Sequence, residues 1–192
     1  MAELIAKTAL DGQRPATGAG LVLATLPPGP VWSIAPFPGV DLAPVLAPLG
    51  LAFPTPGQSS SAGDLRLIWT GRDQAFLLGG AAPPGLEAFA AVTDQTGAWA
   101  GFSLSGEGGE AALARLVTPD LRLAAFPVGH VIRTALNHIP AIILREGRAG
   151  FHIRVFRSMA RSAWHELAAV LERLAARQAA EQARPVPTAP VG

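Results

Sequence analysis

Two stretches of the chain repeat the same order of hydrophobic segments and polar breaks. In the first, residues 31–35 have the composition of a strand, and residues 41–49 have that of a short helix with Asp41 placed to cap it. Residues 65–78 read as a strand, a turn and a second strand, and residues 84–92 can make another helix. The first stretch therefore predicts the order strand, helix, strand, strand, helix.

The second stretch repeats this order further along the chain. Residues 99–104 alternate as a strand with one apolar face, and residues 110–116 are good helix formers with acids early in the segment. A strand at residues 131–136 precedes a hairpin over residues 141–155, whose turn lies at residues 146–150. The repeat predicts two similar structural modules in tandem.

The strongest helical signal comes last. It begins near Ser158, which is placed as its cap, and its apolar positions recur at spacings of three and four residues: Ala160, Trp164, Leu167, Leu171 and Leu174. An apolar stripe of this kind has to pack against a sheet or another helix. We therefore predict an α+β fold of two tandem β-α-β-β-α modules, each a mostly antiparallel sheet covered by helices.

Breaks in the pattern set the expected domain boundaries. We predict a flexible arm over residues 1–20, a first module over 21–92, a second over 93–176 and a flexible tail over 177–192. Residues 54–64, rich in Pro, Gly and Ser, are predicted to form an exposed loop.

Composition narrows the classes of function. The chain has 192 residues, 49% of them hydrophobic, so it can bury a core. A net charge of +1 without a basic block makes nucleic acid a poor partner. Cysteine is absent, which removes disulfides, thiolate metal sites and cysteine nucleophiles.

Hydropathy points to a protein that works with partners. We expect no secretory signal, because the first residues include Glu3 and Asp11 and lack a positively charged lead into an apolar run. We also expect no membrane span, because prolines interrupt residues 15–63, in which Asp41 is the single charged side chain. A cytoplasmic location is therefore expected. Only 15% of the residues are charged and the mean hydropathy is +0.33, values that favour large apolar surfaces buried against another protein. A bias in overall composition toward Ala and Pro is the alternative explanation.

The second module also carries a resemblance to a known family. Residues 91–106 read AVTDQTGAWAGFSLSG, residues 112–116 read ALARL, and residues 156–167 read FRSMARSAWHEL. These segments, in this order, resemble the carboxy-terminal half of the gamma subunits of heterotetrameric sarcosine oxidases. Over roughly residues 90–175 the likeness is good, and the first module matches more weakly.

This resemblance implies a fold similar to the folate-binding domain of the glycine-cleavage aminomethyltransferase. It also implies a structural role in a complex with alpha, beta and delta subunits. Such a complex oxidatively demethylates sarcosine to glycine and, with tetrahydrofolate, gives methylene-tetrahydrofolate and hydrogen peroxide. FAD, FMN, NAD and tetrahydrofolate are then expected on the partner subunits and none on this chain. The alternative is a stand-alone folate-binding protein of the aminomethyltransferase type.

Asp120 is the residue on which that alternative depends. Leu116 to Leu121 matches the Leu-x-x-x-Asp-Leu step at which aminomethyltransferases carry the acid that handles folate. The competing interpretation is a turn at Pro119-Asp120, with the carboxylate bonded to a nearby backbone amide. We favour the turn, because no other recognisable folate ligands occur in the chain.

Two other patterns in the sequence are candidates for ligand sites. Residues 106–111 fit G-x-G-x-x-A after a strand, but Glu107 and Glu110 would lie beside a bound phosphate, so a tight turn is the better interpretation than a nucleotide site. The histidines are too dispersed to make a metal pair, so no metal site is expected: His130, His138, His152 and His165.

Arginine and tryptophan side chains on the predicted strands are candidates for a docking surface. Guanidinium and indole groups together are typical of the centre of a protein interface, although a solvated basic face or core packing would explain them too. The candidates are Arg133, Arg145, Arg154, Trp69 and Trp99.

Overall fold

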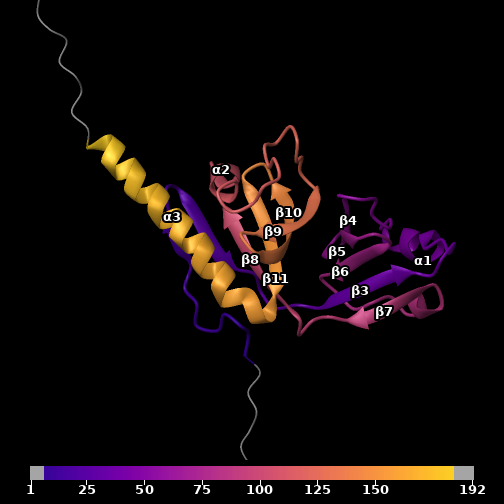
Figure 1. Cartoon of the computed structure of the whole chain (residues 1–192). Coiled ribbons are helices and arrows are strands. Elements are labelled where there is room, and N and C mark those ends of the chain that lie inside the picture. The colour runs from indigo at the N-terminus through magenta and orange to yellow at the C-terminus, as the bar shows by residue number, and fades with distance from the viewer. Residues whose placement is uncertain (1–6, 184–192) are drawn as a thin grey trace, which may run out of the picture.

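The computed structural model describes residues 7–183 and contains two antiparallel sheets (Figure 1). The six-stranded sheet has the order β1 (Ala16–Gly18), β2 (Leu21–Thr25), β8 (Trp99–Ser105), β11 (Gly150–Phe156), β10 (Ile139–Gly147), β9 (Val131–Leu136). The five-stranded sheet has the order β4 (Ser59–Ala62), β5 (Leu65–Gly71), β6 (Gln74–Leu78), β3 (Val31–Pro36), β7 (Ala90–Asp94). The predicted α+β class, with mostly antiparallel sheets, is confirmed.

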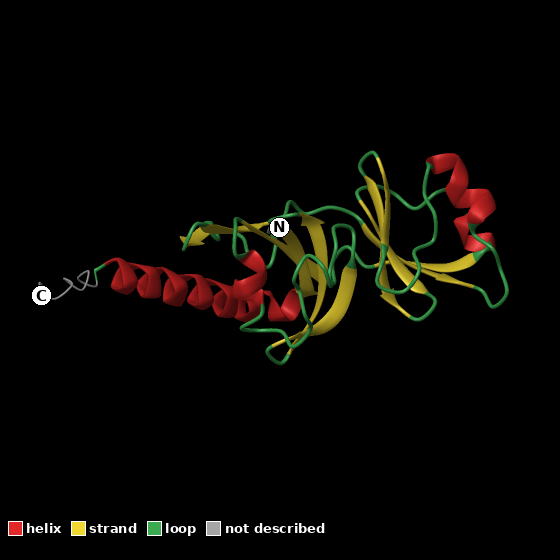
Figure 2. Cartoon of the chain, turned by 90° about the horizontal axis from the view of Figure 1, so that it is seen from above, coloured by secondary structure: helices red, strands yellow, loops and turns green. Residues whose placement is uncertain are grey.

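Helix α3 (Ala160–Gln182) covers one face of the six-stranded sheet, as Figure 2 shows from above. Strand alternation on β11 turns Phe151, Ile153 and Val155 toward this helix, where they join one continuous core. The helix contributes its apolar stripe to the same core: Ala160, Ala163, Trp164, Leu167, Val170 and Leu171. Burial of this stripe explains why α3 forms.

Both ends of α3 differ from the prediction. A 3₁₀ turn (Arg157–Met159) precedes it, and the Ser158 side chain does not cap it. The helix also continues to Gln182, so residues 177–182 are helical where a flexible tail was expected. Good helix formers such as Ala and Arg extend the helix beyond its buried stripe. The rest of the predicted tail and residues 1–6 of the predicted arm lie outside the described residues.

The five-stranded sheet packs against the short helix α1 (Ala43–Leu46) and the 3₁₀ turn after it, Ala47–Leu49. The N-cap residue of α1 is Leu42 and not Asp41 as predicted, although the backbone N–H of Ala43 donates to the carboxylate of Asp41 at 2.9 Å. Leu42, Leu46 and Leu51 fill the core beneath it.

Two predictions within this unit were wrong. Residues 84–92 form only a 3₁₀ turn (Leu86–Ala88) before β7, because Ala90–Asp94 pair with β3 at the sheet edge. The predicted loop at residues 54–64 contains β4, an edge strand that pairs with β5. In both places non-local pairing with an existing strand overrides weak local propensity.

The two units do not follow one another in tandem along the chain. Strands β1 and β2 belong to the six-stranded sheet, because β2 pairs with β8 in the register Leu23↔Leu104. Residues 31–94 are thus inserted between the second and third strands of the other unit, and the boundaries predicted at residues 20, 21 and 92 shift accordingly. The backbone N–H of Leu26 donates to the carbonyl of Gly101 at 2.9 Å. This hydrogen bond lies near the points where the chain leaves the six-stranded sheet for the inserted unit and returns to it.

A third apolar cluster joins the sheets. It combines Val31, Ile68, Phe76 and Leu78 of the inserted unit with Val131, Ile142 and Leu144 of the six-stranded sheet. We call this region the junction. None of the helices within residues 7–183 is long and apolar enough to cross a membrane.

Candidate functional site

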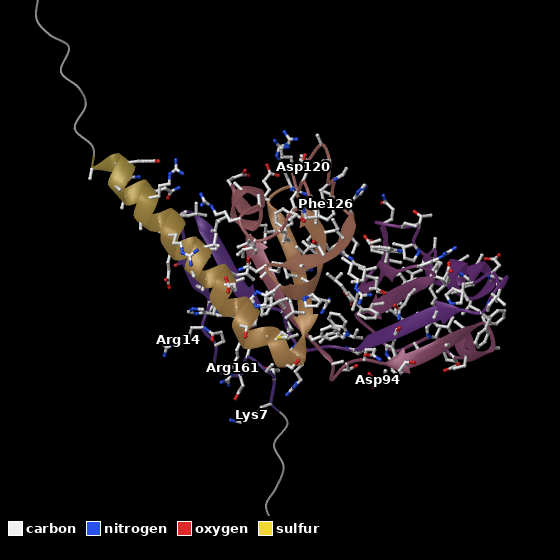
Figure 3. All side chains as sticks on the ribbon, in the orientation of Figure 1. Lys7, Arg14, Asp94, Asp120, Phe126 and Arg161 are labelled. Carbon is white, nitrogen blue, oxygen red and sulfur yellow. The ribbon has the colours of Figure 1, made fainter. Side chains whose placement is uncertain are left out.

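Asp120 lies in the loop that follows α2 (Gly109–Leu113), and Figure 3 shows it near Phe126 above the six-stranded sheet. Its Oδ1 accepts the backbone N–H of Arg122 at 2.9 Å, and its Oδ2 accepts Nη2 of Arg122 at 2.6 Å. Hydrogen bonds from Arg122 lower the pKa of Asp120 to about 2. The carboxylate therefore has the local turn geometry predicted for it, and its low pKa makes it a weak base.

Residues 106–111 form the turn from β8 into α2, with Gly106 and Gly108 at positive φ. A small cavity of about 120 Å³ lies here, lined by Glu107, Glu110 and Arg148 among others. Both neighbours of β8 in the sheet, β2 and β11, are antiparallel to it. A dinucleotide site of the parallel βαβ type therefore has no framework here, and the structure has the tight turn that was favoured.

Arg145 is buried, and its placement at a docking surface was wrong. Its side chain is 1% exposed, and Nη2 donates to Glu110 at 2.9 Å and to the carbonyl of Leu121. Its guanidinium also lies 4.5 Å from the ring centre of Phe151. Partners within the chain thus pair the buried charge through Nη1 and Nη2, as a buried cation requires, while Nε has no hydrogen-bond partner among the described residues.

The other docking candidates lie nearer the surface. Arg133 is exposed on β9, and its Nη1 donates to the carbonyl of Thr70 in the inserted unit at 3.0 Å. Trp69 is half-buried on β5. Trp99 packs in the junction, with its ring centre 5.2 Å from that of Phe76 and 4.5 Å from that of Phe156. Contact of any of these three with a partner protein stays a prediction.

The histidines do not come together. His130 shares a hydrogen bond of 2.9 Å with Gln58, and His152 lies 3.5 Å from Glu146. Within residues 7–183, no group of three or more His, Cys, Asp or Glu side chains could hold a metal ion.

Several charged groups come together in the junction, and their proximity could not be predicted from the sequence. Arg66 of β5 forms an ion pair with Glu146 of β10, and His152 approaches the same carboxylate. Arg154, one alternation further along β11, lies on the same face. The alternation along β11 indicates in the sequence that His152 and Arg154 share the face opposite the core residues. Nothing in the sequence indicates that Arg66 joins them, because Arg66 is distant along the chain.

Arg154 also lines a cavity of about 260 Å³ at the edge of the junction. The cavity walls include Leu26, Pro27 and Thr96 of the two segments that connect the units, and Trp99 and Gly101 of β8. Burial, together with the charge of Arg66, lowers the pKa of Arg154 to about 10. The lining of the cavity therefore combines apolar residues with three threonines and two arginines, Arg154 and Arg157, and Nη2 of Arg157 already donates to the carbonyl of Lys7.

The two antiparallel sheets and their helices define an α+β protein with a fold similar to those of sarcosine oxidase and aminomethyltransferase. The similarity to heterotetrameric sarcosine oxidase from Corynebacterium sp. U-96, in complex with pyrrole 2-carboxylate, has a TM-score of 0.73 at 20% identity. It covers 83% of this chain and 89% of that one. This fits the resemblance to gamma subunits found in the sequence.

Aminomethyltransferase T of the glycine cleavage system from Bartonella henselae is similar as well, with a TM-score of 0.53 at 18% identity. The match covers 79% of this chain but 46% of the aminomethyltransferase, so this chain corresponds to less than half of that protein. No protein-family model matches the sequence. No curated protein matches it either.

Proposed function

We propose that this chain is the gamma subunit of a heterotetrameric sarcosine oxidase, with a structural role in assembly. The observation that carries the proposal is the fold similarity over nearly the whole of both chains, 83% of this one and 89% of the sarcosine oxidase chain. A match of that extent favours a counterpart of similar size over a shared fragment. The segments of residues 91–106 and 156–167 that resemble gamma subunits support the same assignment.

In this proposal the chain docks on the larger alpha and beta subunits, with delta completing the complex in the cytoplasm. FAD, FMN, NAD and tetrahydrofolate are held by those partners. The complex takes the methyl group of sarcosine into one-carbon metabolism as methylene-tetrahydrofolate, with glycine and hydrogen peroxide as the other products. Exposed apolar side chains on several elements of this chain, such as Phe37, Val128 and Met159, are consistent with docking.

A stand-alone folate-binding protein is the second candidate, and the similarity to aminomethyltransferase T is the observation in its favour. The geometry of Asp120 argues against it. Both carboxylate oxygens are engaged by Arg122, and the pKa of about 2 leaves little basicity for proton transfer.

Co-expression tests the proposal. The chain would carry an affinity tag and be produced together with the alpha, beta and delta subunits of a heterotetrameric sarcosine oxidase from the same organism. We expect the larger subunits to co-elute with it, together with flavin absorbance and sarcosine-dependent formation of hydrogen peroxide.

The control is the same set of subunits without this chain. Loss of complex or of activity in its absence supports an assembly role. An oxidase that forms and works equally well without this chain, or a tagged chain that elutes alone, would contradict the proposal. Folate-dependent methyl-group transfer by the chain alone would favour the second candidate.

A further inference from the structure

Arg154 occupies an unusual position for a cation. On β11, Phe151, Ile153 and Val155 face α3, so Arg154 and His152 face the inserted unit across the junction. On the neighbouring strand β8, Gly101 pairs with Arg154, and an added Cβ there would lie 3.2 Å from Nη1 of Arg154. The absence of a side chain at Gly101 leaves the space in which the guanidinium lies.

The charges around Arg154 do not balance. Glu146 is the carboxylate of this cluster, and it is already paired with Arg66 and approached by His152. Among residues 7–183, the Arg154 guanidinium has no ion pair or hydrogen bond within the usual distances. Arg66 adds repulsion, and burial removes part of the water that would solvate the charge. A desolvated cation without a counter-charge is costly, and an anion would remove this cost.

The shape of the cavity limits which anion can bind. Since one water takes up roughly 30 Å³ in the liquid, the cavity of about 260 Å³ has room for a solute of about nine non-hydrogen atoms. Trp99, Leu26 and Pro27 provide apolar wall in the same cavity as the Arg154 side chain. Arginine binds a planar carboxylate through two parallel N–H groups.

We propose that the junction cavity is a binding site for a small carboxylate with a flat apolar body, held by Arg154. The carboxylate accepts the two N–H groups of the guanidinium, and the apolar body lies against Trp99 and Leu26. Such pockets, mostly apolar with a few polar groups that fix orientation, are typical of small-molecule sites. The inference is independent of the proposed function, because every group it uses belongs to this chain.

Benzoate and benzamide provide the probes, because they have the same size and shape and differ in charge. We expect calorimetric titration of the full-length chain to show benzoate binding at least about tenfold more tightly than benzamide, since charge-assisted hydrogen bonds are the stronger ones. Arg154→Gln should abolish the preference. Arg122→Gln, which changes an exposed arginine on another loop, should leave it unchanged.

A second variant guards against misfolding of Arg154→Gln. Gly101→Ala keeps the positive charge but places a methyl group 3.0 Å from Cδ1 of Leu26 and 3.2 Å from Nη1 of Arg154, so it should weaken benzoate binding by severalfold. Circular dichroism would confirm that each variant is folded. Equal affinity of the wild type for the two probes, no binding of either, or an undiminished preference in a folded Arg154→Gln variant would each overturn the proposal.

Discussion

The hydrogen bonds of the Asp120 side chain are local. Its carboxylate is bound by the backbone and side chain of Arg122, two residues away, and by no other group among residues 7–183. An asparagine can keep the acceptor for the backbone N–H of Arg122, because its side-chain carbonyl occupies the place of one carboxylate oxygen. The turn therefore does not need the charge.

We predict that Asp120→Asn changes the sarcosine oxidase activity of the assembled complex by less than about threefold. The measurement is the initial rate of methylene-tetrahydrofolate formation, with gel filtration to show that the complex is intact. A loss of about a hundredfold or more in an intact complex would indicate that Asp120 acts in catalysis.

His152 makes stability depend on pH. Burial lowers its pKa, Glu146 opposes this effect, and Arg154 and Arg66 add to it. The unfolded chain, with its histidine near the ordinary pKa of 6.5, then binds more protons than the folded chain as the pH falls below that value. The free energy of unfolding should decrease from about pH 6.5 downward through the lowered pKa of the folded state.

We predict that His152→Gln reduces this pH dependence. Denaturant unfolding at pH 7.5 and pH 5.5 would show a larger loss of stability in the wild type than in the variant. His165→Gln serves as the control, because His165 is exposed on α3. Identical losses in the wild type and His152→Gln would show that other groups cause the pH dependence.

The distance in sequence between interacting groups decided which site residues could be predicted. The turn at Asp120 and the turn at residues 106–111 depend on neighbours a few residues away, so their geometry could be predicted. Arg145 could not be placed, because its burial depends on Glu110 and Leu121, which are distant in sequence. The cavity beside Arg154 was missed for the same reason, since its walls come from both connecting segments.

At the scale of elements, the contact between β1 and α3 depends on one glycine. An added Cβ at Gly18 would lie 2.5 Å from the carbonyl oxygen of Leu171, which is part of the helix backbone. Backbone of a packed helix cannot move aside as a flexible side chain can. Gly18 therefore lets the edge strand approach the helix closely.

We predict that Gly18→Ala destabilises the chain by about 1–3 kcal/mol, because the strand and the helix must separate to admit the methyl group. Denaturant unfolding followed by circular dichroism measures this change. Gly97→Ala is the matched control, since an added Cβ there meets nothing within 4 Å. Equal stability of the two variants would show that β1 and α3 are not tightly packed in solution.

Local pattern identified the strands of the six-stranded sheet from β8 onward, but not β1, which lies in the predicted flexible arm, or β2. Strands β9, β10 and β11 and helix α3 were all predicted, because strand alternation and the helical stripe are properties of short segments. Strands β4 and β7 were missed, since each is held at a sheet edge by a strand elsewhere in the sequence. The pairing of β2 with β8 could not be read from either segment alone.

At the scale of the whole molecule, apolar surface remains after both sheets are packed. Within residues 7–183, large hydrophobic side chains stay exposed on loops, strands and turns: Val22, Phe37, Val40, Leu49, Leu123, Val128, Phe156 and Met159. With charged residues only 15% of the chain, little charge surrounds them. Burial of such surface in a complex would stabilise the folded chain by mass action.

We predict that the isolated chain is colourless, does not oxidise sarcosine and melts at a lower temperature than it does in the assembled complex. A partner at about 100 times its Kd would add about 2.7 kcal/mol. Absorbance spectra and thermal unfolding, alone and with the larger subunits, check both parts. A stoichiometric flavin spectrum from the chain alone would contradict the first part, and an unchanged melting temperature the second.

The insertion of residues 31–94 has a consequence for the order in which the protein forms during synthesis. All strands of the five-stranded sheet leave the ribosome before β8 does, so this sheet can close while β1 and β2 still lack their neighbour. Its ends are already tied, because the N–H of Gln95 donates to the carbonyl of Val31 at 2.7 Å. Strands β1 and β2 thus remain without β8 until the second half of the chain is made. The inserted sheet brings its own ends together and so shortens the loop that β2 and β8 must close.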